Sequence, residues 1–402
     1  MKEAAIVMLA KRAKAASAKV AALDSKIKNL LLLKMAKALL SSEKKILEAN
    51  RLDVIAAQKN NFAPAFIDRL TLTPKRLREM AKSLKAITRL SDPVGKKTAH
   101  WKTPAGLGVE KVRIPLGVIG MIYESRPDVT VDTAALCLKS GNTVILRGGS
   151  EAWHSNKILS DILRGVLKKN GVNPDIIQLM PPGHAAVKII LEQDKYIDLI
   201  IPRGGESLMK MVRGLSKIPV IRHDKGVCHI FVDRDADLKM AETICLNAKV
   251  QRPGTCNAME CLLVDQKIAT QFLPSLLKKF KNFGVKVRRS SKDWGKEFLD
   301  LELALRVVPN IDAAMDHIQK YGSLHTESII TQNKKHAEKF LKNVLASVVM
   351  VNASTRLNDG FQLGLGSEVG ISTTKLHAFG PMGLEELTTT KFVVRGQGQI
   401  RR

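Results

Sequence analysis

From Pro115 onward, short apolar runs alternate with helical segments, and this alternation limits the folds open to the chain more than any other feature. The first run, 116–123, is followed by a helical stretch at 129–139 and by a second run at 143–147. Further apolar runs lie at 176–180, 197–201, 218–221 and 229–232. Alternating strands and helices predict a parallel, doubly wound α/β sheet, which binds ligands at the carboxyl ends of its strands.

A second unit of the same kind is predicted to begin near Asp235. A helix over 238–249 leads into a short polar turn that holds Cys256, and an apolar strand follows at 261–264. Later strands are predicted at 303–308, 328–331 and 347–351, with helices at 268–282 and 335–343. A chain of 402 residues is too long for one hydrophobic core, so we expect two or three domains.

The remaining sequence predicts a helical block and a β arm. Residues 3–90 show apolar side chains three and four positions apart, and Thr73-Pro74 is a typical helix start. Two alternating stretches, 98–103 and 107–113, flank a Pro-Ala-Gly turn and predict a hairpin. The end of the chain, 387–400, is predicted to be extended and to pair with that hairpin.

The turn around Cys256 is a candidate nucleophilic site. Pro253 and Gly254 end the preceding helix, and Arg252 favours the thiolate, which is the nucleophilic form of cysteine. A buried structural cysteine is the alternative, because free cysteine is among the most buried residue types. The five cysteines are odd in number and form no C-x-x-C pair, which argues against disulfides and a zinc site and indicates a reducing cytoplasm.

Two glycine pairs each follow a predicted strand, in Arg147-Gly148-Gly149 and in Arg203-Gly204-Gly205. Glycine lets the backbone approach a phosphate, and the N-terminus of a following helix favours an anion. Neither pair has the G-x-G-x-x-G spacing, so an ordinary tight turn is the alternative at each place.

The segment 251–257, Gln-Arg-Pro-Gly-Thr-Cys-Asn, closely resembles the catalytic segment of the gamma-glutamyl phosphate reductase family of the aldehyde dehydrogenase superfamily. The resemblance spans nearly the whole chain, and 352–383 also matches family signature segments. Gly254 departs from the family, in which many members carry serine, without a consequence expected for the chemistry. The resemblance implies an aldehyde dehydrogenase-like α/β fold, with two doubly wound parallel-sheet domains and a small β oligomerisation arm.

The resemblance also implies a division of the chain into domains. We expect a cofactor-binding domain at 1–97 and 114–233, and a catalytic domain at 234–384. The oligomerisation arm would comprise 98–113 and 385–402, which predicts a homo-oligomer. A plain surface hairpin is the alternative for the arm.

The activity implied by the resemblance is the NADPH-dependent reduction of L-glutamyl 5-phosphate to L-glutamate 5-semialdehyde and phosphate, in L-proline synthesis. Cys256 would form a thioester that accepts a hydride, and Arg126 would be the donor to the oxyanion, with a surface salt bridge as its alternative role. The implied NADPH/NADP-binding residues are Arg147, Gly148, Gly149, Arg203, Gly204 and Gly205. The expected substrate-binding residues are Arg252, Asn352, Ser354 and Thr355.

Two other functions stay open from the sequence. A hydrolytic aldehyde dehydrogenase would need a glutamate base, but His223-Asp224-Lys225-Gly226 occupies the corresponding region, and His229 is better explained as a core histidine. A nucleic-acid-binding protein would suit the net charge of +27, but the lysines are spread over the whole chain and only three Trp and three Tyr are available for stacking.

The expected partners are therefore small molecules, with glutamate 5-kinase as one possible protein contact. We expect no nucleic acid, no resident metal and no membrane, since no apolar run reaches about 18 residues. We interpret the basic, alanine-rich start of the chain as part of the fold rather than as a transit peptide, which predicts a cytoplasmic protein.

Overall fold

The computed structural model describes residues 3–222 and 225–401, which divide into two compact units. Unit 1 comprises 1–222, 365–370 and 382–402, and unit 2 comprises 223–364 and 371–381. Each unit has its own parallel sheet, as the alternating pattern predicts. Within the described ranges, no helix combines the length and the apolar character that crossing a bilayer requires.

The sheet of unit 1 has the strand order β5-β4-β3-β6, with all neighbours parallel. Its strands are β3 (Val118–Tyr123), β4 (Thr143–Arg147), β5 (Ile177–Leu179) and β6 (Leu199–Arg203). Because β4 and β6 lie on opposite sides of β3, the winding direction reverses between β3 and β6. Ligand crevices of doubly wound sheets form outside the carboxyl ends of the strands at such a reversal.

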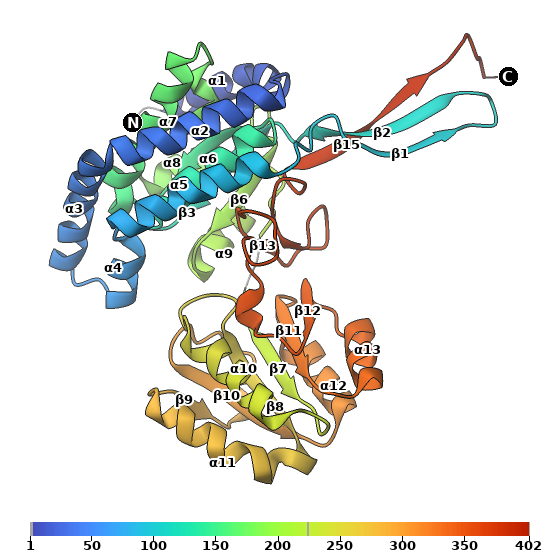
Figure 1. The fold of residues 1–402 in the computed structure, drawn as a ribbon. Coiled ribbons are helices and arrows are strands. Elements are labelled where there is room, and N and C mark those ends of the chain that lie inside the picture. Colours follow the sequence, from blue (N-terminus) through green and yellow to red (C-terminus); the bar gives the residue numbers. More distant parts are fainter. Residues whose placement is uncertain (1–2, 223–224, 402) are drawn as a thin grey trace. The chain divides into compact units, whose positions relative to one another are not determined.

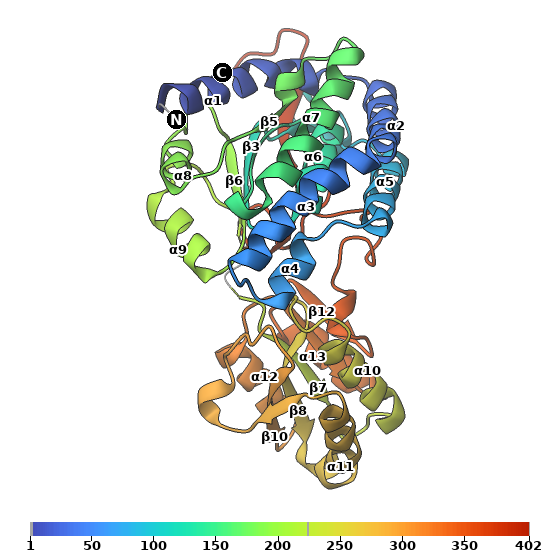
Figure 2. The ribbon, with the colours of Figure 1, turned by 90° about the vertical axis from the view of Figure 1, so that its left-hand side faces the viewer.

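Helices cover both faces of this sheet (Figure 2). One face carries α1 (Glu3–Ala21), α8 (His184–Leu191) and α9 (Glu206–Leu215), whose apolar side chains share a core with β3, β4 and β6. The other elements of the unit are α6 (Pro127–Lys139), α7 (Trp153–Lys169), α2 (Ser25–Ser41), α3 (Glu43–Lys59), α4 (Pro64–Leu70), α5 (Pro74–Arg89), η1 (Ser150–Ala152) and η2 (Pro174–Ile176). The predicted start of α5 is confirmed, since the Thr73 hydroxyl accepts a hydrogen bond from the Arg76 amide at 3.2 Å.

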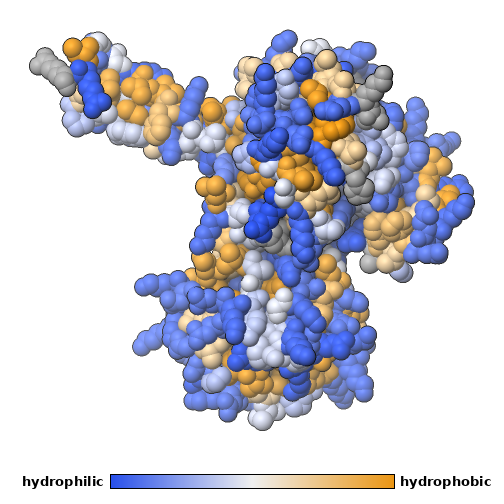
Figure 3. Space-filling model, turned by 180° about the vertical axis from the view of Figure 1, so that it is seen from behind, coloured by the Kyte–Doolittle hydropathy of each residue, from blue (hydrophilic) through white to orange (hydrophobic). Residues whose placement is uncertain are grey.

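A three-stranded antiparallel sheet forms the arm of unit 1, in the order β1-β2-β15. Its strands are β1 (Lys97–Lys102), β2 (Gly108–Pro115) and β15 (Thr388–Arg395), so the predicted pairing of the chain end with the hairpin is confirmed. The arm extends away from the helices of its unit (Figure 1), and apolar side chains lie on its surface (Figure 3). Trp101 and Phe392 are exposed there and meet edge to face, with ring centroids 6.1 Å apart.

The sheet of unit 2 has the strand order β12-β11-β7-β8-β10-β9 and is again parallel. Its strands are β7 (Cys228–Val232), β8 (Met259–Asp265), β9 (Lys286–Arg288), β10 (Glu302–Val308), β11 (Thr326–Ile330) and β12 (Val348–Val351). Short elements accompany them: η3 (Ser291–Asp293), η4 (Thr355–Leu357), β13 (Ile371–Ser372) and β14 (Gly380–Pro381).

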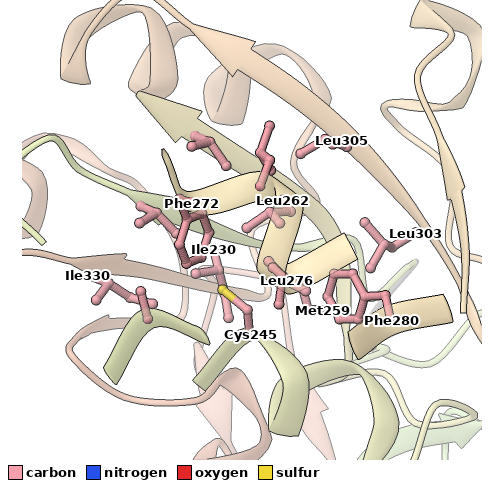
Figure 4. Close-up of a cluster of buried hydrophobic side chains, with 14 of the residues drawn as sticks. Ile230, Cys245, Met259, Leu262, Phe272, Leu276, Phe280, Leu303, Leu305 and Ile330 are labelled. Carbon is pink, nitrogen blue, oxygen red and sulfur yellow. The ribbon is translucent and has the colours of Figure 1, made fainter. Parts of the chain in front are cut away.

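Two hydrophobic cores hold the faces of this sheet. One lies under α10 (Leu238–Val250) and α11 (Gln266–Asn282), where Ile230 packs with side chains of both helices (Figure 4). The other lies under α12 (Ile311–Tyr321) and α13 (Lys334–Asn343) and contains Phe231. Neighbouring side chains of β7 lie in opposite cores, so the whole strand is buried. Strands buried on both faces are largely apolar, and His229 is the exception in β7.

The structure differs from two expectations, one about a domain boundary and one about a strand. The domain boundary expected at residue 233 lies instead near 222, because β7 pairs with β8 and β11 and so belongs to unit 2. The strand expected at 218–221 is reduced to an isolated bridge between Ile200 and Val220. Pro219 has no N–H to donate to a ladder, although its carbonyl accepts from Ile200 at 2.9 Å.

Candidate active site

Cys256 lies in a turn between α10 and β8, at the amino ends of the strands of unit 2. Helix α10 ends at Val250, just before Pro253 and Gly254, as the sequence predicts. Cys256 is half-buried, whereas Cys137, Cys228, Cys245 and Cys261 are buried. Burial raises the pKa of the thiols of Cys137, Cys228 and Cys245, which makes them poor nucleophiles. Solvent access therefore favours Cys256 as the reactive thiol of the chain.

The backbone of Cys256 is held from the side of β7. A Cβ atom added to Gly226 would lie 2.7 Å from the Cys256 Cα and closer still to its carbonyl oxygen. The thiol of Cys228 donates to that same carbonyl at 3.1 Å. These contacts fix the peptide that carries the nucleophile, and none of them was predicted from the sequence.

The polar side chains of the turn hold it from the other side. The Thr255 hydroxyl donates to the Arg252 carbonyl at 2.8 Å, and the buried Asn257 side chain donates to the Asn358 carbonyl at 2.8 Å. The guanidinium of Arg356 donates to the side chains of Gln251 and Asn257. Arg356 thus belongs to the site, although its only local signal was its place in a polar, glycine-rich segment.

A buried ion pair lies behind the turn. Lys249 Nζ and Glu260 Oε2 are 2.9 Å apart, and both side chains are fully buried. Glu260 Oε1 also accepts from the Leu299 amide at 3.2 Å. Burial raises the pKa of Glu260 to about 7, against the opposing effect of Lys249. The pair connects the end of α10 to β8 on the two sides of Cys256.

The four predicted substrate-binding residues occupy different places. Arg252 is exposed beside Cys256. Ser354 is buried and its hydroxyl accepts from the Arg356 amide at 3.4 Å, while Thr355 is fully buried. Asn352 exchanges two hydrogen bonds of 2.9 Å with the backbone of Thr331, beyond the carboxyl end of β11. The Cys256 turn is at the amino ends of the strands, so the structure does not bring the Asn352 side chain to it.

In unit 1, the loop after β4 carries Arg147, Gly148 and Gly149. An added Cβ atom at Gly148 would collide with the buried Asn156 side chain, so packing within the chain favours glycine there. At Gly149 it would lie 2.5 Å from the Glu151 carboxylate, which is the end of a flexible side chain and can move. Burial lowers the pKa of Arg147, and the carboxylate of Glu151 acts against this shift. Glu151 is four residues from Arg147 in the sequence. In the structure its negative charge is close enough to the guanidinium to act on the pKa of Arg147.

The N-terminus of α7, which follows this loop, is already occupied. Asp53 accepts hydrogen bonds from the amides of His154, at 3.2 Å, and Ser155, at 2.8 Å, and from the Ser155 hydroxyl at 2.6 Å. An anionic ligand would therefore find these donors engaged. The Nε atom of Arg147 in this loop is buried and has no hydrogen-bond partner among the described residues, so it is the donor left for a ligand.

The second glycine pair follows β6 at the reversal point of the sheet. The Gly205 amide donates to Glu124 Oε1 at 2.8 Å, and a Cβ on Gly204 would lie 2.6 Å from Glu124. Arg203 packs against Gly370, where an added Cβ would lie 2.9 Å from its guanidinium. Arg126 is half-buried after β3 and occupies the N-cap position of α6. Glu124, which was not predicted from the sequence, thus contacts both glycines of the pair.

Histidines and a cysteine gather inside unit 2, although the cysteine spacing gave no sign of it. His229, Cys261 and His317 lie close together and are buried. His317 Nδ1 accepts from Arg306 at 2.8 Å, so its Nε2 carries a proton and faces the Cys261 sulfur at 3.6 Å. A protonated nitrogen does not bind a metal, so the group is a hydrogen-bonded one. His229 pairs with Glu327 at 3.0 Å, as a core histidine should.

The base region of hydrolytic aldehyde dehydrogenases corresponds to 223–226. His223 and Asp224 lie outside the described residues. Of the neighbouring carboxylates, Glu297 accepts a hydrogen bond from the Gly226 amide at 3.0 Å. This engagement holds Glu297 against the loop that supports Cys256.

Comparison with known proteins adds a consistent set of similarities. The sequence profile of the aldehyde dehydrogenase family matches residues 1–295. The chain is 53% identical, over 98% of both chains, to a gamma-glutamyl phosphate reductase of Thermodesulfovibrio yellowstonii, and 52% identical, over 98% of both chains, to one of Desulfatibacillum aliphaticivorans. The crystal structure of gamma-glutamyl phosphate reductase from Thermotoga maritima superposes with a TM-score of 0.95 at 43% identity, over 99% of this chain and 100% of that one. An acetylating aldehyde dehydrogenase from Geobacillus thermoglucosidasius shares the fold, with a TM-score of 0.76 at 16% identity, over 100% and 98% of the two chains.

Proposed function

The chain belongs to the aldehyde dehydrogenase family, among the gamma-glutamyl phosphate reductases of proline biosynthesis, and we propose that it reduces L-glutamyl 5-phosphate with NADPH through a thioester on Cys256. The observation that carries the proposal is that Cys256 is only half-buried, unlike the other four cysteines, and lies in a turn whose backbone is held on both sides. Such a turn presents one accessible sulfur at a fixed position, as nucleophilic catalysis requires.

In the proposed reaction, the thiolate of Cys256 attacks the acyl carbon of the substrate and phosphate leaves. NADPH supplies the hydride that reduces the thioester, and the aldehyde is then released with the free thiol. The developing charge on the acyl oxygen needs donors. We assign this role to the Cys256 amide and to Arg126, the latter on family resemblance.

The residues of unit 1 are compatible with an NADPH site at the carboxyl ends of β4 and β6. The unpartnered Nε of Arg147 supports this assignment, because a phosphate can accept its hydrogen bond. The two loops that follow these strands contain the glycine pairs Gly148-Gly149 and Gly204-Gly205. Arg203 follows β6 on the same edge of the sheet. Preference for the 2′-phosphorylated cofactor is part of the proposal, and Glu151 is the charge that opposes it.

The reverse reaction tests the proposal. The protein is incubated with L-glutamate 5-semialdehyde and NADP, and NADPH formation is followed with and without inorganic phosphate. Sustained turnover should require phosphate, or arsenate in its place, because phosphate is an anion at pH 7 and needs no general base to attack the thioester. Steady production of free glutamate without phosphate would favour the hydrolytic aldehyde dehydrogenase instead, with Glu297 as the first base to examine.

The proposal also includes cytoplasmic function as a homo-oligomer. The exposed apolar residues of the arm, such as Trp101 and Phe392, support self-association, because apolar surface gains free energy by burial. Contact with glutamate 5-kinase is proposed because an acyl phosphate hydrolyses readily in water.

A further inference from the structure

Two arginines near Cys256, Arg252 and Arg356, form no salt bridge with any described residue. Arg252 is exposed and Arg356 is half-buried. Within residues 3–222 and 225–401, neither guanidinium forms a salt bridge, whereas many other lysines and arginines of the chain do. The carboxylate of Asp359 acts on Arg356 only from beyond salt-bridge distance. Because the two like charges repel one another, the pair is suited to an anionic ligand.

Arg356 is fixed in place by the turn that carries the nucleophile. Its Nε donates to Gln251 Oε1 at 2.9 Å, and its Nη1 donates to Asn257 Oδ1. These partners stand at the two ends of the segment that contains Cys256. The remaining nitrogen, Nη2, has no hydrogen-bond partner in the part of the chain that the structure describes. The guanidinium is therefore both rigid and able to donate further hydrogen bonds.

The charged groups that act on Arg356 show that its guanidinium lies near Arg252 and Cys256. Burial lowers the pKa of its guanidinium, and the nearby charge of Arg252 lowers that pKa further. Ionisation of Cys256 acts in the opposite direction, ahead of Asp359 and Cys228. A guanidinium stays charged in proteins, so the two arginines create a positive potential at the Cys256 sulfur.

We propose that Arg356 and Arg252 form the binding site for the phosphate group of the substrate. In the forward direction they hold the phosphate that leaves when Cys256 is acylated, and in the reverse direction they hold the inorganic phosphate that attacks the thioester. This inference rests on the proposed function and adds Arg356 to the residues that contact substrate.

The chemistry of the step is consistent with this site. The sulfur–carbon bond forms and the bond from the acyl carbon to the phosphate oxygen breaks, so the electron pair of that bond leaves with the phosphate. The negative charge brought by the thiolate thus departs on the phosphate, and nothing is oxidised or reduced. Guanidinium groups bind phosphate through paired hydrogen bonds and stabilise this charge as it develops.

The α-carboxylate of the glutamyl group is the other anion available to the arginines. It carries one charge and lies several bonds from the acyl carbon, whereas the phosphate is attached directly to that carbon. Arg356 is bonded to Asn257, the residue next to the nucleophile. Proximity to the sulfur therefore favours the phosphate.

The test compares Arg356→Lys, Arg356→Gln and Arg252→Gln with the native protein. Arg289→Gln is the matched control, because Arg289 is an exposed arginine next to the edge strand β9 of the same unit. Three quantities are measured: the KM for phosphate in semialdehyde oxidation, the amplitude of the single NADPH burst without phosphate, and the phosphate concentration that half-protects Cys256 from iodoacetamide.

We expect Arg356→Gln and Arg252→Gln each to raise the KM and the half-protecting concentration of phosphate at least tenfold. The burst can become slower in these variants, but its amplitude should stay near one NADPH per chain, because the amplitude counts reacting thiols and not their rate. Arg356→Lys should fall between, and Arg289→Gln should match the native protein. Unchanged phosphate constants in both glutamine variants would overturn the inference, as would a raised KM for semialdehyde alone, which would assign the arginines to the α-carboxylate.

Two further outcomes distinguish failure of the phosphate site from failure of the proposed function. Loss of the burst in Arg356→Gln, with normal phosphate constants in Arg252→Gln, would show that Arg356 only supports the turn and would contradict the site. A native protein whose turnover does not depend on phosphate would instead contradict the proposed function.

Discussion

Gly226 lies directly against the backbone of Cys256, so closely that an added Cβ atom would be 2.7 Å from the Cys256 Cα. The two residues precede the neighbouring parallel strands β7 and β8, which fixes their spacing through the sheet. The nucleophile is thus positioned by a glycine 30 residues earlier in the chain.

Gly226→Ala should displace the Cys256 turn, because backbone atoms cannot give way as a flexible side chain can. Misplacement of a reacting group by about 1 Å costs on the order of a hundredfold in rate. We expect kcat to fall by about that factor while circular dichroism stays native. Gly254→Ala is the control in the same turn, since its nearest heavy atom is the Leu299 carbonyl oxygen at 3.6 Å. Equal activities of the two variants would show that the contact is unimportant.

Glu260→Gln should destabilise unit 2, because it leaves the buried ammonium of Lys249 without a counter-charge. Removal of one partner of a buried ion pair costs about 3–5 kcal/mol. The double variant Lys249→Met with Glu260→Met should recover most of that loss. Urea denaturation followed by circular dichroism measures both, and Glu242→Gln, which breaks the exposed pair with Lys279, should cost below about 1 kcal/mol. A loss for Glu260→Gln as small as for Glu242→Gln would contradict the account.

Arg147→Ala should weaken the binding of NADPH more than that of NADH. A charged hydrogen bond to a phosphate contributes about 1.5–3 kcal/mol, or roughly ten- to a hundredfold in Kd. Glu151→Gln should have the opposite effect and shift the preference toward NADPH, because it removes the negative charge near Arg147. Isothermal titration with both cofactors measures these changes. Equal losses for NADPH and NADH in Arg147→Ala would mean that Arg147 does not bind the 2′-phosphate.

His317 should make unit 2 sensitive to acid. Burial lowers the pKa of its imidazole to about 3, helped by the charges of His229 and Arg306. An unfolded histidine binds a proton near pH 6.5, but the folded one does not until about pH 3, so stability falls as the pH drops between these values. His317→Gln removes the imidazole, so the loss of folding stability that its protonation causes in acid should be absent from the variant. Melting temperatures from pH 7.5 to 4.5 should show the gap between the variant and the native protein narrowing in acid, and a constant gap would exclude His317 as the cause.

Local patterns in the sequence predicted most of the fold. The apolar runs that became β3, β4, β8 and β10 are each rich in branched apolar residues and followed by helical periodicity, so strand and helix could be distinguished locally. The membership of β7 could not be predicted in this way. Its residues are apolar on both faces, which shows that it is a central strand but not in which sheet it lies.

The candidate site was predicted in part. Cys256 and Arg252 are neighbours in a recognisable turn, so sequence alone could select them. Arg356 is joined to Asn257 across 99 positions, and Gly226 touches Cys256 only because β7 and β8 pair. Contacts of this kind depend on tertiary structure and leave no local signal. For the same reason, the family resemblance of the segment grouped Asn352 with Ser354 and Thr355, although the Asn352 side chain is hydrogen-bonded to Thr331.

The most direct test of the account is a single turnover of the semialdehyde on Cys256 without phosphate. The protein is mixed with NADP and L-glutamate 5-semialdehyde, NADPH is followed by stopped-flow absorbance, and the quenched protein is weighed by mass spectrometry. We predict a burst of one NADPH per chain and a glutamyl adduct that maps to Cys256, with neither in a folded Cys256→Ala variant. A burst and adduct that persist in Cys256→Ala, or an adduct on another cysteine, would contradict the account.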